Sequence, residues 1–236
     1  MNMEQTFRNQ YPFMAALLQF DETSRRFKLV CGGSLISATK ILTAAHCVTQ
    51  NNTILDKLVV KLGMHFLSET EDDAEHNAAH NFNEIGIVTL ESPVEFTDKI
   101  STVCLPKECH LEMEFYDSTR AVGWGNSKEG EENYGALRHM TGTMITKEFC
   151  IEFTRSRKIE LANHMICAFP FYGGLCQNFD GGPMVLQRPV STYGECPWIQ
   201  LGIIISANGC HEKPEPDVYT RLTSFWSWID NKVKPL

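Results

Sequence analysis

The stretch Cys176-Gln177-Asn178-Phe179-Asp180-Gly181-Gly182-Pro183 is the part of this 236-residue chain that decides how the rest is interpreted. A second stretch, Leu42-Thr43-Ala44-Ala45-His46-Cys47, places a histidine directly before another cysteine. Five further short motifs occur along the chain: Tyr11-Pro12-Phe13-Met14-Ala15-Ala16-Leu17, Cys31-Gly32-Gly33-Ser34-Leu35-Ile36, Cys104-Leu105-Pro106, Gly123-Trp124-Gly125 and Pro216-Asp217-Val218-Tyr219-Thr220-Arg221. Motifs in one fixed order are far more specific than any one of them alone, so they are interpreted together.

Taken together, these motifs resemble those of the chymotrypsin-like serine proteases over nearly the whole chain. In that family the stretch at 176–183 reads Cys-x-Gly-Asp-Ser-Gly-Gly-Pro, so Asp180 stands where the nucleophilic serine is found. The stretch at 42–47 is similar to the family's general-base motif and is intact at His46. The resemblance implies a protease fold that has lost its nucleophile.

Short β-like runs separated by turn-rich segments predict an all-β chain. A different pattern, apolar residues at helical spacing, predicts a terminal helix over residues 224–233. The resemblance implies one trypsin-like domain of two packed antiparallel β-barrels, about 11–108 and 109–223, followed by a helix at about 224–234. The interval from Gly63 to Glu84 is much shorter than in typical relatives, so a strand pair of the first barrel is expected to be missing or replaced by the acidic loop 69–75. The predicted strands are residues 28–30, 58–62, 85–90, 118–122, 137–143, 184–186 and 199–205.

The composition excludes several classes of protein. A hydrophobic content of 43% is ordinary for a globular domain and is inconsistent with wholesale disorder. The formal net charge of −8 argues against a nucleic-acid partner, which would require clustered lysine and arginine. No apolar run of 18 residues occurs, so the sequence predicts no membrane span.

Nine cysteines without a C-x-x-C pair predict disulfides rather than a zinc site, and hence an oxidising compartment. The sequon at Asn51 fits a glycosylated loop of a secreted protein. Residues 1–10 contain no apolar segment of the kind found in signal peptides. We therefore interpret the chain as a processed or incomplete form of a secreted, extracellular protein.

The resemblance also implies disulfide pairs. Its pattern joins Cys31 to Cys47, Cys150 to Cys167 and Cys176 to Cys210. A further bridge common in the family is missing, because both of its positions, near Thr119 and Leu186, lack cysteine. Three cysteines remain, and we expect Cys109 to pair with Cys196 while Cys104 tethers an upstream segment. The odd total independently requires one cysteine to be free or bonded to another chain.

The positions of the catalytic triad are degenerate, and none is predicted to be catalytic. The carboxylate that orients the histidine corresponds to Glu84, one methylene longer than the family's aspartate. Asp180 is a poor nucleophile toward an amide. We expect it to form an ion pair with a protonated His46, supported by Glu84. A protonated histidine cannot act as a general base, so we predict no proteolysis.

The framework around the triad departs from the family as well. Active relatives pair a freed Ile-Val-Gly-Gly terminus with the aspartate before the serine, but that aspartate is Phe179 here and no such tetrapeptide precedes Tyr11. The oxyanion-hole positions are Asn178 and Asp180. Asn178 replaces a glycine, and asparagine tolerates left-handed backbone better than most residues.

The substrate-pocket positions of the family have changed too. The position of the trypsin-type aspartate is Gly174, while Asp217 replaces a glycine on the facing strand. This exchange allows either a pocket for a basic residue or a plugged, disused pocket, and the second interpretation is preferred. The pocket positions are Gly174, Leu175, Ile205, Ser206, Ala207 and Asp217.

No cofactor or metal is predicted. The loop 69–75 lies where some relatives bind calcium, but a solvated acidic loop is the preferred interpretation. The spacing of His76 and His80 is taken as a surface coincidence. Glu84, His46 and Asp180 offer a two-carboxylate, one-histidine set, and an internal ion-pair cluster is preferred over a metal site.

The sequence therefore predicts a non-catalytic serine protease homologue that binds proteins. Its expected partners are a protease, zymogen, inhibitor or receptor of an extracellular cascade, which the resemblance implies and which the family's recognition loops would suit. Three alternatives remain open: a residually active or unconventional trypsin-like endopeptidase, a small-ligand-binding module that uses the vestigial cleft, and a defective gene product that does not fold stably.

Overall fold

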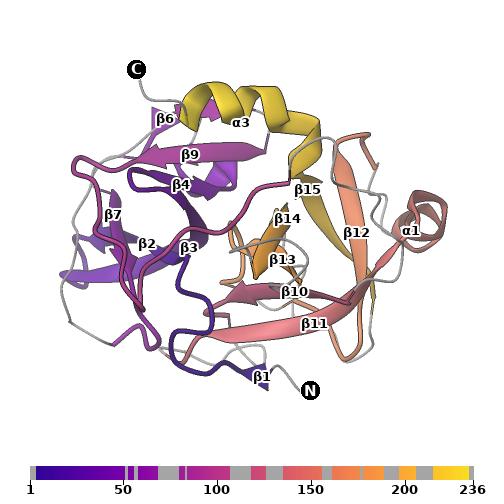
Figure 1. Cartoon of the computed structure of the whole chain (residues 1–236), viewed down its shortest axis with the longest axis horizontal. Helices are drawn as coiled ribbons and strands as arrows, with labels where there is room; N and C mark the ends of the chain where they lie inside the picture. Colours follow the sequence, from indigo (N-terminus) through magenta and orange to yellow (C-terminus); the bar gives the residue numbers. More distant parts are fainter. Residues whose placement is uncertain are drawn as a thin grey trace.

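The computed structural model describes residues 4–50, 53–55, 58–68, 80–82, 84–106, 118–125, 135–155, 161–175, 178–188, 197–205 and 215–233. Nearly all of its regular structure is antiparallel β-sheet, arranged in two large sheets that lie side by side (Figure 1). This confirms the predicted all-β, trypsin-like fold with a C-terminal helix; one of the two sheets closes into a barrel.

The first sheet contains six strands among the described residues. β7 illustrates why they form: its side chains alternate between buried and half-buried positions, as expected for a strand with one face on the core. β8 is only three residues long, and the acidic loop 69–75 that precedes it lies outside the described residues. In spatial order the strands are β7 (Leu58–Leu62), β2 (Met14–Asp21), β3 (Arg26–Ser37), β4 (Lys40–Thr43), β9 (Ile85–Thr89) and β8 (His80–Phe82). Two short strands, β5 (Thr49–Gln50) and β6 (Thr53–Ile54), pair separately.

The second sheet closes into a barrel, because β11 pairs with both β10 and β12. Thr119 and Leu186, the positions at which the family's common bridge is missing, are direct cross-strand partners and are both buried. A short strand, β1 (Glu4–Gln5), adds to the outer edge of β11. The barrel strands in order are β11 (Arg138–Ile145), β10 (Ser118–Gly123), β13 (Pro183–Gln187), β14 (Trp198–Ile204), β15 (Asp217–Arg221) and β12 (Met165–Pro170).

Helices lie outside the sheets. α1 (Lys147–Thr154) connects β11 to β12, and Thr146 caps it by accepting a hydrogen bond from the Phe149 backbone N–H at 3.2 Å. A 3₁₀ turn, η4 (Leu222–Phe225), leads into α3 (Trp226–Val233), which confirms the predicted C-terminal helix. None of the helices among the described residues has the length and apolar character that crossing a membrane requires.

Three buried clusters lie among the described residues; the smallest surrounds the Cys150–Cys167 disulfide, and the other two are larger. The largest one joins the first sheet to Val122, Trp198 and Ile203 of the second, and Ile229 of α3 packs into it. The next fills the closed barrel and includes Phe179. Because the largest core spans both sheets, the loops that meet between them are held at fixed positions.

Candidate functional site

The turn that carries Asp180 docks directly on the first sheet. The backbone N–H of Gly32, on β3, donates a hydrogen bond to the Asp180 carbonyl oxygen at 2.8 Å. The next residue, Gly181, has φ +75°, and a Cβ there would collide with the Thr43 hydroxyl and the Gly32 carbonyl. Glycine is therefore required at position 181 both by backbone conformation and by space.

His46 lies on a short 3₁₀ turn, η1 (Ala45–Cys47), and the Cys47 sulfur of this turn lies beside Gly181. A disulfide joins Cys47 to Cys31 on β3, directly before the residue that contacts Asp180. The His46 side chain is exposed, and its Nε2 atom lies 3.6 Å from the Cys47 sulfur. The fold thus brings the segments carrying positions 46 and 180 together on adjacent residues of β3.

The side chains do not pair as the sequence predicted. Among the residues that the structure describes, His46 forms no ion pair with Asp180 or with Glu84. The predicted His46–Asp180 ion pair is absent from the described residues, where the His46 Nε2 atom lies 3.6 Å from the Cys47 sulfur.

Glu84 is turned toward a residue that the sequence analysis missed. It has φ +64°, a left-handed conformation that is strained for glutamate, immediately before β9 begins at Ile85. Its Oε2 atom lies 3.3 Å from Nε2 of His164, and the His164 ring packs edge-on against Phe225 at 5.6 Å. No sequence signal pointed to His164, because 80 positions separate it from Glu84 and only the fold brings the two together.

One further grouping near His46 has the residue types of a metal site. The potential ligand atoms of Cys31, His46 and Cys47 all lie within 4.8 Å of one another. The two sulfurs are bonded to each other, however, and a metal ligand must be a thiolate. This grouping therefore offers a single imidazole and does not form a metal site.

The residues next to Asp180 have distinct environments. Asn178 has φ +71°, the left-handed conformation that a glycine would adopt most easily and that asparagine tolerates. Phe179 is completely buried, and its ring lies so close to Gly123 that a Cβ at that glycine would collide with it. The barrel core therefore includes the ring at position 179.

Two of the predicted pocket positions, Leu175 and Asp217, meet at the start of β15. Asp217 is 4% exposed, and its Oδ1 atom accepts a long hydrogen bond from the Leu175 backbone N–H at 3.5 Å. Burial, followed by the nearby Asp217 carboxylate, raises the pKa of Tyr219 well above its usual value. Gly174 is buried beside Leu175 and Ile205 is half-buried, whereas Ser206 and Ala207 lie outside the described residues.

Two of the disulfides that the resemblance implies are present in the structure, and one expectation about the cysteines is wrong. Cys31 is bonded to Cys47, and Cys150 of α1 to Cys167 of β12. Cys104 is disulfide-bonded within this chain, so the expected tether to an upstream segment is wrong. The remaining predicted positions, Cys109, Cys176, Cys196, Cys210 and Asn51, lie outside the described residues.

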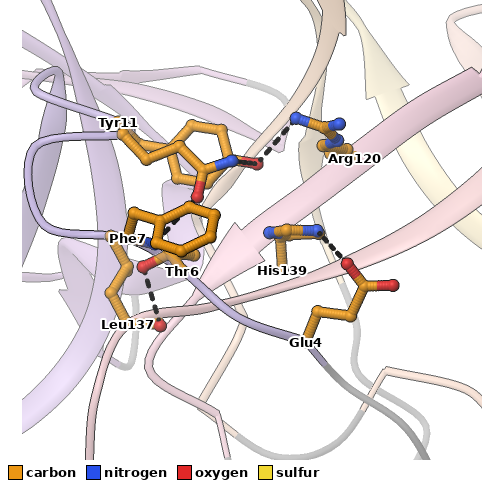
Figure 2. A network of polar contacts seen from close by, with 8 residues as sticks. Glu4, Thr6, Phe7, Tyr11, Arg120, Leu137 and His139 are labelled. Atoms are coloured by element: carbon orange, nitrogen blue, oxygen red, sulfur yellow. Dashed lines mark hydrogen bonds and ion pairs between the residues drawn. The ribbon is translucent and has the colours of Figure 1, made fainter.

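The N-terminal segment pairs with β11 through β1, and Figure 2 shows Glu4 and Thr6 beside His139 and Leu137. The Thr6 hydroxyl donates to the Leu137 carbonyl at 2.9 Å, and Glu4 Oε2 lies 3.3 Å from His139 Nε2. Burial and the Arg120 guanidinium lower the pKa of His139, and the carboxylate of Glu4 only partly opposes them. Burial raises the pKa of Tyr11 to about 12, although Arg120 opposes the rise.

Comparison with known proteins places the chain in a family. The profile described as Trypsin matches residues 1–229. The chain belongs to the trypsin family. Clotting factor G beta subunit of Tachypleus tridentatus is 31% identical over 244 aligned residues, which cover 94% of this chain and 75% of that protein. Proclotting enzyme of the same organism is also 31% identical, over 84% of this chain and 57% of its own length.

The positions that the sequence analysis assigned to the catalytic triad each have their own contacts. The histidine position faces a disulfide, the carboxylate position contacts His164, and the residue before Asp180 is a buried aromatic ring. An enzyme of this family needs a nucleophile, a base and an orienting carboxylate in one hydrogen-bonded series. The described side chains at these three positions do not form that series.

Proposed function

We propose that this trypsin-family chain is a non-catalytic homologue that acts by binding proteins of an extracellular proteolytic cascade. The observation that carries the proposal is Asp180, which stands at the nucleophile position of the resembling motif. Serine proteolysis begins when a histidine removes the hydroxyl proton and the oxygen attacks the amide carbonyl. An ionised carboxylate has no such proton to give and attacks amides poorly.

The contact between Glu84 and His164 supports the proposal independently of Asp180. A triad histidine must be held in one tautomer and orientation by a carboxylate. Here the Glu84 carboxylate is 3.3 Å from the His164 ring, and His46 instead has its Nε2 atom 3.6 Å from the Cys47 sulfur. A serine restored at position 180 would therefore still lack an oriented base.

Phe179 also supports the proposal, because it replaces a residue that active relatives use during activation. In active relatives the resembling position is an aspartate that receives the freed N-terminal ammonium. Phe179 offers no charge to an ammonium, and its ring is already packed in the barrel core. Residues 4–6 are paired with the outside of the barrel through β1 and Thr6. This arrangement needs no activation step to order the turn at Asp180.

The nature of the partners is inferred from the relatives and from the surface. Both relatives are named as members of a clotting process, one as a clotting factor subunit and the other as a proclotting enzyme. We infer that the chain is secreted, carries a glycan at Asn51, and binds a protease, zymogen, protease inhibitor or receptor of such a cascade. Loops on a rigid β-scaffold are well suited to this kind of recognition.

Crosslinking tests the binding role directly. The disulfide-bonded protein is added to the secreted fluid of its source, crosslinked, and its partners are identified by mass spectrometry, with reduced and unfolded chain as the control. We expect a protease, zymogen, inhibitor or receptor to be enriched on the folded chain only. Recovery of the same proteins with the unfolded control, or of none while near-ultraviolet circular dichroism shows the native fold, would contradict the proposed role.

A further inference from the structure

Three phenylalanine rings follow one another across the outside of the second barrel. Phe149 and Phe153 lie one turn apart on α1, with ring centroids 5.0 Å apart. The Phe153 ring in turn lies 5.8 Å from that of Phe169 on β12. Phe149 is 44% exposed and Phe153 is 37% exposed, so solvent reaches both helix rings.

Phe171 extends this series along the strand. Its backbone N–H donates to the Thr141 carbonyl at 3.0 Å, which continues the antiparallel register that pairs Phe169 with Thr143. Residues two apart in a ladder share a face, so Phe171 lies on the same side as Phe169. Phe171 is 50% exposed. We call Phe149, Phe153, Phe169 and Phe171 the aromatic ridge; Figure 1 shows α1 and β12, which carry it, at the outer edge of the barrel.

A contiguous ridge of this kind differs from scattered surface residues. Single exposed hydrophobic side chains are normal on soluble proteins, whereas contiguous apolar patches mark interaction sites. Phe96, for comparison, is 56% exposed but lies in the loop between β9 and Cys104, on a different part of the chain. It therefore provides a matched reference for any effect of exposed aromatic rings alone.

Two carboxylates accompany the ridge. Glu148 and Glu152 are exposed, lie one helical turn apart, and each precedes one of the helix phenylalanines directly in the sequence. The two cations of this helix are at its ends: Lys147 donates to Asn163 at 2.7 Å, and Arg155 is the C-cap residue. Like charges one turn apart on a helix repel each other, so a cation bound between them would relieve that repulsion.

We propose that the aromatic ridge and the Glu148–Glu152 pair form a docking surface for a segment of a partner protein that presents arginine among apolar side chains. Arginine is the residue that fits both features, because its guanidinium stacks on aromatic faces and binds carboxylates through two N–H groups. Arginine and aromatic residues also carry much of the energy in protein interfaces. The net charge of −8 favours approach of such a partner.

This inference rests on the proposed binding role and assigns it a surface and a partner chemistry. The ridge is formed by α1, β12 and the residue that follows β12, none of which carries His46, Glu84 or Asp180. Substitutions on the ridge therefore leave the triad positions intact. Proteolysis by the chain would contradict the proposed non-catalytic role, whereas unchanged binding in the ridge variants would contradict only the docking surface. The two proposals can therefore fail independently.

A peptide library tests the proposal. The full, disulfide-bonded chain is screened against immobilised random dodecapeptides, and the best binder is then measured by fluorescence anisotropy. We expect selected peptides to combine arginine with aliphatic or aromatic residues. Phe149→Ser/Phe153→Ser and Glu148→Gln/Glu152→Gln should each weaken binding at least tenfold, and arginine-to-lysine exchange in the peptide should weaken it too. Phe96→Ser should change the affinity less than twofold.

Several outcomes would overturn it. These are selection of peptides without arginine, unchanged affinity in both ridge variants while circular dichroism shows native folds, or an equal loss in Phe96→Ser. Sedimentation velocity tests whether a second copy of the chain covers the ridge. A dimer that is present in the wild-type chain and absent in Phe149→Ser/Phe153→Ser would show this and overturn the proposal.

Discussion

The carboxylate of Glu84 lies 3.3 Å from Nε2 of His164, and the two residues adjoin different sheets of the fold. Glu84 directly precedes β9 of the first sheet, while His164 directly precedes β12 of the second. Their side chains are 42% and 35% exposed, so water screens the pair in part. The contact joins the two sheets, whereas no ion pair among the described residues joins Glu84 to His46.

A double-mutant cycle should detect this contact. Partly exposed ion pairs contribute little, so we expect a coupling free energy of about 0.5 kcal/mol between Glu84→Gln and His164→Gln in urea unfolding. Glu95→Gln, at an exposed carboxylate in the loop after β9, should show no coupling to His164→Gln. Zero coupling at position 84 as well would mean that the two side chains do not interact in solution.

Restoring the family's nucleophile should not restore proteolysis. In Asp180→Ser the histidine would still lack its orienting carboxylate, because Glu84 contacts His164. We expect hydrolysis of fluorogenic peptides by Asp180→Ser to equal that by Asp180→Ser/His46→Ala. If the single variant cleaves and the double variant does not, the missing serine is the only defect of the site.

Phe179 should behave as a core residue. Because it is completely buried in the closed barrel, Phe179→Ala should lower the free energy of unfolding by about 3–5 kcal/mol. Phe179→Asp should cost more, since it would bury an unpaired charge. Phe96→Ala, at an exposed ring, should change stability by less than about 0.5 kcal/mol. A loss below about 1 kcal/mol for Phe179→Ala would show that the ring does not fill the core.

Stability should fall in mild acid because of His139. Its pKa is lowered in the folded chain by burial and by Arg120, so the unfolded chain binds the proton more readily. This contribution to stability is complete above the ordinary histidine pKa of about 6.5 and is lost as the pH falls from there through the lower folded pKa. His139→Gln should flatten the dependence of the urea midpoint between pH 7.5 and 5.

Glu4 provides the complementary variant for that experiment. Its carboxylate raises the pKa of His139 against the two larger effects, so Glu4→Gln should lower that pKa further and steepen the loss of stability in acid. The explanation is contradicted if His139→Gln retains the wild-type slope, or if Glu4→Gln makes the slope shallower.

The sequence predicted those features that depend on local pattern and motif order. The all-β fold, the C-terminal helix and strand β7 follow from alternation, helical spacing and the family's motifs. Asn178 is a related example: the sequence analysis noted that asparagine tolerates the left-handed conformation, and the residue has φ +71°. Both kinds of inference concern backbone, which local sequence restricts strongly.

Side-chain partners at the site could not be predicted in the same way. The expected His46–Asp180 pair assumed that opposite charges brought close by the fold would meet, yet His46 faces a disulfide and Glu84 meets His164. Each outcome depends on the rotamer and on residues distant in sequence. Cys104 is a further example. The order of the motifs identified it as the family's tethering position, but its bond within the chain depends on the tertiary structure and could not be predicted.

The central claim is that this trypsin-family chain does not cleave peptide bonds. The most direct measurement incubates the purified, disulfide-bonded chain with a diverse peptide library and identifies cleavage products by mass spectrometry, with His46→Ala in parallel. We predict no product from the wild-type chain above the level in His46→Ala. Products formed by the wild-type chain and absent from His46→Ala would contradict the claim and show that His46 supports catalysis without serine at position 180.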